Sequence, residues 1–410
     1  MLQHEENERL CRTGPGTPMG EALRRYWTPM CPAADVAEPD GPPRAVQRLG
    51  ERFVVFRDSG GRVGVLDEAC CHRGASLRFG RVEDGGIRCL YHGWKFDVEG
   101  CVLETPNVAD PRVRERLRAP AYPVHVAGDV VFAYLGPPGT APAPPRYSWM
   151  DGPSERRFVY EHVQEHSNWL QVLEGGLDSA HVGILHGDEM ALATLGLYDP
   201  DGIGADRYPT TDLAPRLEIE ATPYGFVYAA LRDAIEPGKQ YVRITPYVAP
   251  YLTFPAMRSG VMRLPRDDDS TVTISVSYDP DGTPDREAIL RRQGMHLPEV
   301  YGPDRVLRIP EQDRPAMAAR KSFTGLDGFN VQDGAMTMFM GEAILDRTKE
   351  HVVPTDAAVV RVRRLLLDLV DQVERGEAPL GTGPGVDTSA VAGASGLVGA
   401  GERWQGLLGT

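Results

Sequence analysis

The sequence feature that most constrains this chain is a pair of short cysteine–histidine spacings. Cys70 precedes His72 in the segment CCHRGASL, and Cys89 precedes His92 in the segment CLYHGW. Each pair spans only a turn of chain, so two loops that carry such pairs can close around one metal centre. The sequence therefore predicts a metal site assembled from two loops.

Two kinds of metal site use two cysteines and two histidines. A structural zinc site binds one ion with all four side chains, whereas a Rieske [2Fe–2S] cluster has two thiolates on one iron and two imidazoles on the other. Zinc fingers pair cysteine with cysteine, but here each loop supplies one cysteine and one histidine. Gly74 and Gly93 permit tight turns that point backbone N–H groups at sulfur. These details favour the iron–sulfur cluster over zinc.

The two loops, written CxHRGAxL and CxxHGWxFD, resemble the cluster-binding loops of Rieske oxygenases. Respiratory Rieske proteins add a disulfide between the loops, but the corresponding positions here are Ala75 and Tyr91, which favours the oxygenase type. Cys71 stands where the family commonly has proline and is expected to be a buried spectator thiol. The resemblance assigns four cluster ligands: Cys70, His72, Cys89 and His92.

A second group of metal-binding residue types lies in the segment NWLQVLEGGLDSAHVGILH, where Asp178, His181 and His186 are spaced D-x2-H-x4-H. On a helix, Asp178 and His181 would share a face. His186 would lie off that face, so the helix is expected to bulge or end between the histidines, near Gly183. Two histidines and one carboxylate form the facial triad of non-haem iron(II) oxygenases, which leaves open positions for O2.

The residues alone do not choose among Asp327, Asp333 and Asp346 as the carboxylate ligand. The segment NVQDGAMTMFMGEAILDRTKEH resembles the C-terminal motif of the phthalate-dioxygenase-type branch of the family. That resemblance implies that Asp333 completes the mononuclear iron site with His181 and His186.

The resemblance implies a catalytic role of another kind for Asp178. In this branch the matching carboxylate joins a cluster histidine of one subunit to an iron histidine of the next, so Asp178 would connect His92 of a neighbouring subunit with His181. The expected assembly is a head-to-tail homotrimer or a dimer of trimers. The expected electron donor is a separate NADH-dependent reductase with a flavin and a plant-type [2Fe–2S] domain, since this chain has no G-x-G-x-x-G after a strand.

The sequence predicts an α+β protein in three parts. Residues 1–45 are expected to form a helical lead-in that packs with the catalytic domain, and residues 46–140 an antiparallel β domain that holds the cluster. Residues 141–410 are expected to form a helix-grip-type catalytic domain, an antiparallel sheet with helices, that holds the mononuclear iron.

Local patterns place the regular elements within these parts. Helices are expected in residues 1–30 and 161–181, and from Thr355 as N-cap to Gly376 as stop. The Gly/Ala/Ser-rich tail, residues 380–400, is expected to be irregular. Strands are expected in the apolar runs RFVVF, RVGVL, GDVVFAYL, RLEIEA, GFVYAAL, QYVRITPYV and TVTISVSY.

Charge and composition exclude several classes of function. The net charge is 44 − 58 = −14, which disfavours nucleic acids and anionic membrane surfaces. No stretch approaches the ~20 apolar residues of a membrane span, and the first residues do not resemble a signal peptide. We therefore expect a cytoplasmic protein without nucleic-acid or membrane partners.

The expected function is that of the terminal oxygenase component of a ring-hydroxylating dioxygenase, acting with O2 on a phthalate-like aromatic carboxylate. A buried carboxylate needs a bidentate cationic partner, and Arg207 and Arg243, with Ser179, are the candidate substrate-binding residues. The alternative is a Rieske monooxygenase, a hydroxylase or O-demethylase, acting on another aromatic compound or natural product, neutral ones included. A pure electron carrier would leave the second ligand set without a purpose.

Overall fold

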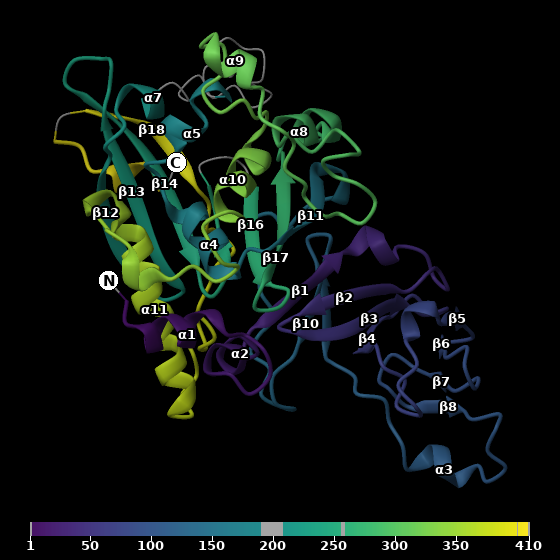
Figure 1. The fold of residues 1–410 in the computed structure, drawn as a ribbon. Helices are drawn as coiled ribbons and strands as arrows, with labels where there is room; N and C mark the ends of the chain where they lie inside the picture. The colour runs from purple at the N-terminus through teal and green to yellow at the C-terminus, as the bar shows by residue number, and fades with distance from the viewer. Residues whose placement is uncertain (1, 190–207, 256–258, 400, 409–410) are drawn as a thin grey trace. The chain divides into compact units, whose positions relative to one another are not determined.

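The computed structural model describes residues 2–189, 208–255, 259–399 and 401–408, and the chain divides into two compact units. The smaller unit is Thr13–Pro145, and the larger unit combines Met1–Arg12 with Arg146–Thr410 (Figure 1). Within the described ranges, none of the helices combines the length and the apolar character needed to span a lipid bilayer.

The smaller unit is built from three antiparallel sheets. Their strand orders are β1-β10-β9, β2-β3-β4 and β5-β6-β7-β8. The strands are β1 (Trp27–Pro32), β2 (Arg44–Arg48), β3 (Glu51–Arg57), β4 (Val63–Asp67), β5 (Arg81–Glu83), β6 (Gly86–Arg88), β7 (Lys95–Phe96), β8 (Val102–Glu104), β9 (Val124–Ala127) and β10 (Val130–Tyr134). The short helices are α2 (Pro18–Leu23) and α3 (Arg112–Glu115).

The beginning of the chain differs from the sequence prediction. Helix α1 (His4–Cys11) belongs to the larger unit, but residues 13–45 belong to the smaller one, because β1 pairs with β10 along its length. Residues 1–30 are therefore not helical throughout. Pro29 and Pro32 lie within β1, and two prolines in six residues exclude a helix there.

The larger unit contains one antiparallel sheet of eight strands in the order β11-β17-β16-β15-β14-β13-β12, with β18 also paired to β14. This is the expected sheet of the catalytic domain, and the predicted strands are present. The strands are β11 (Arg157–Glu165), β12 (Arg216–Thr222), β13 (Gly225–Asp233), β14 (Lys239–Val248), β15 (Leu252–Thr253), β16 (Ser259–Pro265), β17 (Ser270–Tyr278) and β18 (Ala394–Gly399).

Helices accompany this sheet (Figure 1). They are α4 (Trp169–Leu177), α5 (Val182–Leu185), α7 (Tyr208–Thr211), α8 (Arg286–Arg292), α9 (Arg314–Ala318), α10 (Phe329–Thr337) and α11 (Ala357–Glu374). Helix α11 is close to the predicted one: its N-cap is Asp356 rather than Thr355, and Gly376 follows its end with φ +75°. Alternate side chains of β11, β14, β16 and β17 line one cavity together with residues of α4 and α10.

Two predictions of local structure are wrong. The stretch 161–181 is not one helix, because its first residues form β11, paired with β17 in unbroken register from Arg157 to Glu165. The tail 380–400 is not irregular throughout, because β18 pairs with Lys239–Ile244 of β14. Both strands are stabilised by partners distant in sequence, which local pattern does not reveal.

A buried charge network anchors α4 to the C-terminal part of the larger unit. Glu174 of α4 accepts hydrogen bonds from Arg347 at 3.0 Å and from Arg363 of α11 at 2.6 Å. Arg363 also donates to Glu350. Arg347 is fully buried, and the side chains of Arg363 and Glu174 are 6% and 9% exposed. The helix that precedes the two candidate histidine ligands is therefore held by desolvated ion pairs.

Replacing Glu174 with glutamine should lower the free energy of unfolding by about 3–5 kcal/mol, because the positive charges of two buried guanidinium groups are then no longer fully neutralised. Denaturant unfolding of the purified protein measures the change. Glu374→Gln is the control, since Glu374 pairs with Arg9 at the surface and such pairs contribute about 0–1 kcal/mol. Equal stability of the two variants would contradict the prediction.

Candidate metal centres and active site

The two predicted cluster loops follow β4 and β6 and share one turn geometry. In each, the cysteine N–H donates to the carbonyl oxygen five residues on, at 2.8 Å. The glycine four residues on donates back to the cysteine carbonyl, Gly74 to Cys70 at 2.8 Å and Gly93 to Cys89 at 3.0 Å. Both glycines have positive φ, +72° and +75°, the region that favours glycine. Their N–H groups therefore close the turns instead of pointing at sulfur, and the N–H that faces Cys70 Sγ belongs to His72.

The loops bury the cysteines and leave the histidines at the surface. Cys70 and Cys89 are 2% and 3% exposed and belong to the apolar core of the smaller unit. His72 and His92 are half-buried, with ring centroids 4.5 Å apart. The His72 ring stacks on Trp94 at 4.5 Å and 6°. A group held here has its sulfur side in a low-dielectric core and its imidazole side at the protein surface.

These four residues suit a two-iron cluster better than a single zinc ion. Neither all four of their donor atoms nor any three of them lie within 4.8 Å of one another, as ligands of one tetrahedral ion would. Burial, together with the nearby Cys89 thiol, raises the pKa of Cys70 to about 12, so a bound metal is needed to keep it as the thiolate. Cys71 is exposed, not buried as predicted, because its side chain does not share the inward direction of Cys70.

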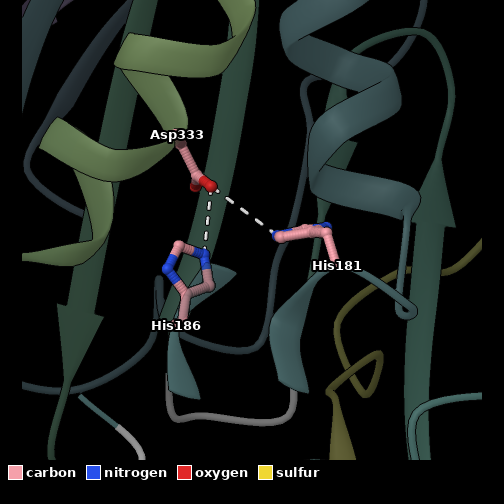
Figure 2. Close-up of side chains that lie close together, drawn as sticks. All are labelled: His181, His186 and Asp333. Atoms are coloured by element: carbon pink, nitrogen blue, oxygen red, sulfur yellow. Dashed lines mark ion pairs between the residues drawn. The ribbon is translucent and has the colours of Figure 1, made fainter. Parts of the chain in front are cut away.

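Asp333, His181 and His186 converge in the larger unit, as Figure 2 shows. Asp333 Oδ1 lies 3.0 Å from His186 Nε2 and 3.6 Å from His181 Nε2. The imidazole centroids are 5.1 Å apart at 76°. In the described part of the chain, one other group of three such residues is as close, the surface set Asp97, Glu99 and Cys101. Two imidazole nitrogens and a carboxylate oxygen facing one point fit the facial triad of non-haem iron.

The helix geometry around the histidines differs from the prediction. Helix α4 ends at Leu177, so Asp178 is its C-cap and does not share a helical face with His181. The two histidines flank the single-turn helix α5, His181 at its start and His186 at its end. Gly183 is not the break but lies within α5, where an added Cβ would come within 1.9 Å of the Pro209 carbonyl oxygen.

Asp178 orients His181. Its Oδ2 lies 3.3 Å from His181 Nδ1, and its Oδ1 accepts the Ala180 N–H at 2.7 Å. Burial alone would raise the pKa of Asp178, but the contacts with His181 outweigh burial and lower it. An ionised carboxylate on Nδ1 leaves Nε2, the atom that faces Asp333, for a metal.

Gln332 has the corresponding place at His186, and the sequence analysis missed it. Gln332 Oε1 lies 2.7 Å from His186 Nδ1, while its Nε2 donates to the Leu326 carbonyl at 2.7 Å. That donation orients the amide, so its oxygen faces Nδ1, which must carry the proton. Nε2 of His186 is thereby left as the metal-binding atom. The sequence signal was the QD pair itself, of which only Asp333 was used.

Replacing Gln332 with leucine should weaken iron binding about 10–100-fold, the usual effect of losing a hydrogen-bond partner of a metal-binding histidine. Iron retained during titration with a chelator measures it, and cluster absorption should not change. Gln312→Leu is the matched control, because Gln312 donates to Thr324 of the same loop without touching His186. Equal iron retention in both variants would count against this role.

A cavity of about 930 Å³ contains the triad and two of the predicted substrate-binding residues. Ser179 is buried, and its hydroxyl and carbonyl oxygens accept hydrogen bonds from Arg232. Arg243 of β14 faces the cavity, and its guanidinium makes no hydrogen bond or ion pair with any residue that the structure describes. Arg207 lies outside the described residues. Arg263 of β16 also lines the cavity, and the sequence analysis missed it, although it is a lone cation between apolar residues in VMRLP.

Comparisons with known proteins agree with the two units. Residues 26–123 match the family model of the Rieske [2Fe-2S] domain, and residues 133–408 match the model "LigXa C-terminal domain like". The fold resembles the crystal structure of dicamba monooxygenase bound to dicamba, with a TM-score of 0.59, 18% identity, and coverage of 87% of this chain and 99% of that one.

Two curated relatives align over nearly the whole chain. The oxygenase subunit of phthalate 4,5-dioxygenase from Pseudomonas putida is 40% identical over 93% of this chain and 89% of its own length. The oxygenase subunit of 3-chlorobenzoate-3,4-dioxygenase from Comamonas testosteroni is 33% identical over 94% of this chain and 92% of its own. The chain therefore belongs to the Rieske oxygenase α subunits, non-haem iron oxidoreductases that carry a Rieske [2Fe–2S] cluster and a mononuclear iron.

Proposed function

We propose that this chain is the terminal oxygenase component of a dioxygenase that acts on a phthalate-like aromatic carboxylate. The observation that carries the proposal is one cavity that contains both the candidate iron-binding triad and the guanidinium of Arg243, which has no partner among the described residues. When bound, the cluster supplies electrons and the mononuclear iron supplies the site of O2 chemistry. The relatives named phthalate and 3-chlorobenzoate dioxygenase support an aromatic acid as substrate.

The protein's own residues would bind and orient the ring. Arg243 would bind the substrate carboxylate together with Ser179. Arg207 is proposed as a further partner of the carboxylate and lies outside the described residues. Tyr228 and Tyr241 line the same cavity and are buried, so they offer flat apolar contact to an aromatic substrate and exclude water. The carboxylate contact would set which ring edge faces His181, His186 and Asp333.

We propose that electrons reach this site from a neighbouring subunit, in a homotrimer or a dimer of trimers. Just before His92 in the chain, Leu90 and Tyr91 are 65% and 61% exposed. In the larger unit, Met336 and Phe339, just beyond Asp333, are also exposed. Apolar surfaces beside both metal sites suit a contact between copies, in which the neighbour's His92 would meet Asp178. A strictly monomeric active protein in sedimentation would refute this arrangement.

We propose that a separate NADH-dependent reductase with a flavin and a plant-type [2Fe–2S] domain delivers the electrons. The sequence carries no G-x-G-x-x-G dinucleotide motif after a strand, and the relatives are named as oxygenase subunits. Turnover should therefore require an added reductase. Turnover with NADH and the purified chain alone would refute the proposal.

Replacing Arg243 with methionine should raise KM for the aromatic acid at least ~100-fold, because a desolvated carboxylate that loses its charged partner costs about 2–5 kcal/mol. Iron content should not change, because Arg243 is not a ligand. Steady-state kinetics with the acid and its methyl ester measure the effect, and the variant should discriminate between them far less than the wild type does.

Arg216→Met is the control, since Arg216 lies on the exposed surface of β12 and pairs with Glu218. A wild type that prefers uncharged aromatics would overturn the carboxylate proposal. The chain would then be a monooxygenase, a hydroxylase or O-demethylase, acting on a neutral ring.

A further inference from the structure

Arg263 is a second cation of the cavity, and it forms no ion pair with a carboxylate in the described part of the chain. It lies on β16, is half-buried and lines the cavity. Its Nη1 donates to Thr253 Oγ1 at 2.8 Å. Among the residues that the structure describes, the Arg263 guanidinium makes no other hydrogen bond and no ion pair. Four of the five N–H donors of the guanidinium are therefore not used by any described residue.

Helix α4 is shaped to admit this guanidinium. A Cβ added to Gly176 would lie 2.3 Å from Arg263 Cζ and 2.4 Å from its Nη1. At the neighbouring Gly175, an added Cβ would meet only Thr337 Cγ2, at 3.7 Å. Glycine is unfavourable inside a helix compared with alanine. The close contact gives a physical reason for glycine at position 176, namely to keep the guanidinium in its place.

The cavity wall around Arg263 is polar, and some of its polar atoms have no hydrogen-bond partner among the described residues. Burial lowers the pKa of Arg263 to about 10, so the group stays charged at neutral pH. His162, on the same cavity wall, is 2% exposed, and no described residue makes a hydrogen bond with its Nδ1. Burial lowers the pKa of His162 to about 4, so it is neutral. The charge of Asp333 raises the pKa of Arg263 and so partly offsets the effect of burial. We assign this carboxylate to the iron, however. A desolvated cation without its own anion is unfavourable unless a ligand supplies one.

The positions of Arg243 and Arg263 show what such a ligand would look like. Val248 of β14, Leu252 of β15 and Met262 of β16 stand side by side. Arg243 lies five residues before Val248, and Arg263 lies one residue after Met262 in the same direction. The Cα atoms of the two arginines are thus roughly 20 Å apart along the strands and about 10 Å apart across the sheet. Their side chains both face the cavity of about 930 Å³, near the upper end of ligand pockets.

We propose that Arg263 is a second anion-binding position, so that the substrate is an aromatic diacid whose carboxylates lie at opposite ends and are held by Arg243 and Arg263. This inference rests on the proposed carboxylate function and narrows it, from an aromatic acid of the general kind of phthalate to a diacid whose carboxylates are well separated. Two adjacent carboxylates on one ring would reach only one of the two guanidinium groups, whereas para-placed acids, or acids on two linked rings, reach both.

Equilibrium binding to the oxidised holoprotein, measured by calorimetry, tests the inference. The probes are benzene-1,4-dicarboxylate and biphenyl-4,4′-dicarboxylate, each with its monomethyl ester, and benzene-1,2-dicarboxylate. In the wild type, at least one of the two separated diacids should bind at least about tenfold more tightly than its monoester and than the 1,2-diacid. Arg263→Met should abolish that preference while monoester binding persists, and Arg216→Met should leave it unchanged.

A second variant keeps the charge but moves it. Gly176→Ala favours the helix yet displaces the guanidinium, so it should reduce the preference for separated diacids in the same direction as Arg263→Met. It decides the question if Arg263→Met does not fold. A preference that survives in Gly176→Ala and in Arg263→Met would overturn the inference, as would loss of iron from Arg263→Met, which would assign Arg263 to the metal site.

The outcomes also separate this inference from the proposed function. If Arg243→Met weakens monoester binding but the wild type shows no preference for a second carboxylate, the inference fails and the carboxylate function stands. If the wild type binds the corresponding dimethyl esters as tightly as the acids, the carboxylate function fails and the inference fails with it.

Discussion

Replacing His181 with alanine is expected to reduce oxygenation to background while leaving the visible absorption of the Rieske cluster unchanged. His181 faces Asp333 at 3.6 Å in the larger unit, so its loss removes one of the three proposed iron ligands. The cluster ligands lie in the smaller unit, whose core packs around Cys70 and Cys89. Metal analysis should therefore show cluster iron and sulfide but no mononuclear iron.

The converse variant is the control for this separation. Cys89→Ser should abolish the cluster absorption, because Cys89 is buried in the core of the smaller unit, and mononuclear iron should remain bound. Loss of the chromophore in His181→Ala would be incompatible with the assignment of two independent centres.

Replacing Asp178 with asparagine should lower turnover by at least about 100-fold with both metals retained. Asparagine keeps the size of the side chain but removes the charge that faces His181 Nδ1 at 3.3 Å. Because the contacts with His181 lower the pKa of Asp178, the wild-type carboxylate is ionised throughout the neutral range. The cluster should still be reduced normally by a chemical donor, which places the defect after cluster reduction.

Single-turnover measurements with the pre-reduced protein distinguish this defect from loss of iron. Product formation should be slow in Asp178→Asn while iron content stays equal to that of the wild type. Near-normal turnover in the variant would remove Asp178 from the electron path and, with it, the main reason to expect a ring of subunits.

Patterns that depend on neighbours in sequence were predicted well. The strands RLEIEA, GFVYAAL and TVTISVSY alternate or are continuously apolar, and each is a strand of the larger sheet. The tight turns of the two proposed cluster loops could be predicted, because each contains a glycine with the positive φ that the turn needs. Helix α11 could be predicted because its apolar stripe and Gly376 are local signals.

The predictions of local structure that were wrong concern strands whose partners are distant in sequence. The segment 157–165 forms a strand because β17, more than a hundred residues later, pairs with it. The Gly/Ala/Ser-rich segment 394–399 forms a strand because β14 offers an open position beside it. Backbone pairing with a sheet outweighs weak local preference, and no window of neighbouring residues contains that information.

The residues of the candidate sites also divide into those that local sequence patterns indicate and those that only tertiary contacts reveal. The sequence by itself determined the four cluster ligands and the histidines His181 and His186 as candidates, because ligand spacing along a loop or short helix is local chemistry. Only the tertiary structure brings Asp333 beside His186, aims Gln332 at that histidine, and places the Arg263 guanidinium against Gly176. Those contacts join segments far apart in the chain, and the packing of α4, α5 and α10 against one sheet decides which side chains meet in the cavity.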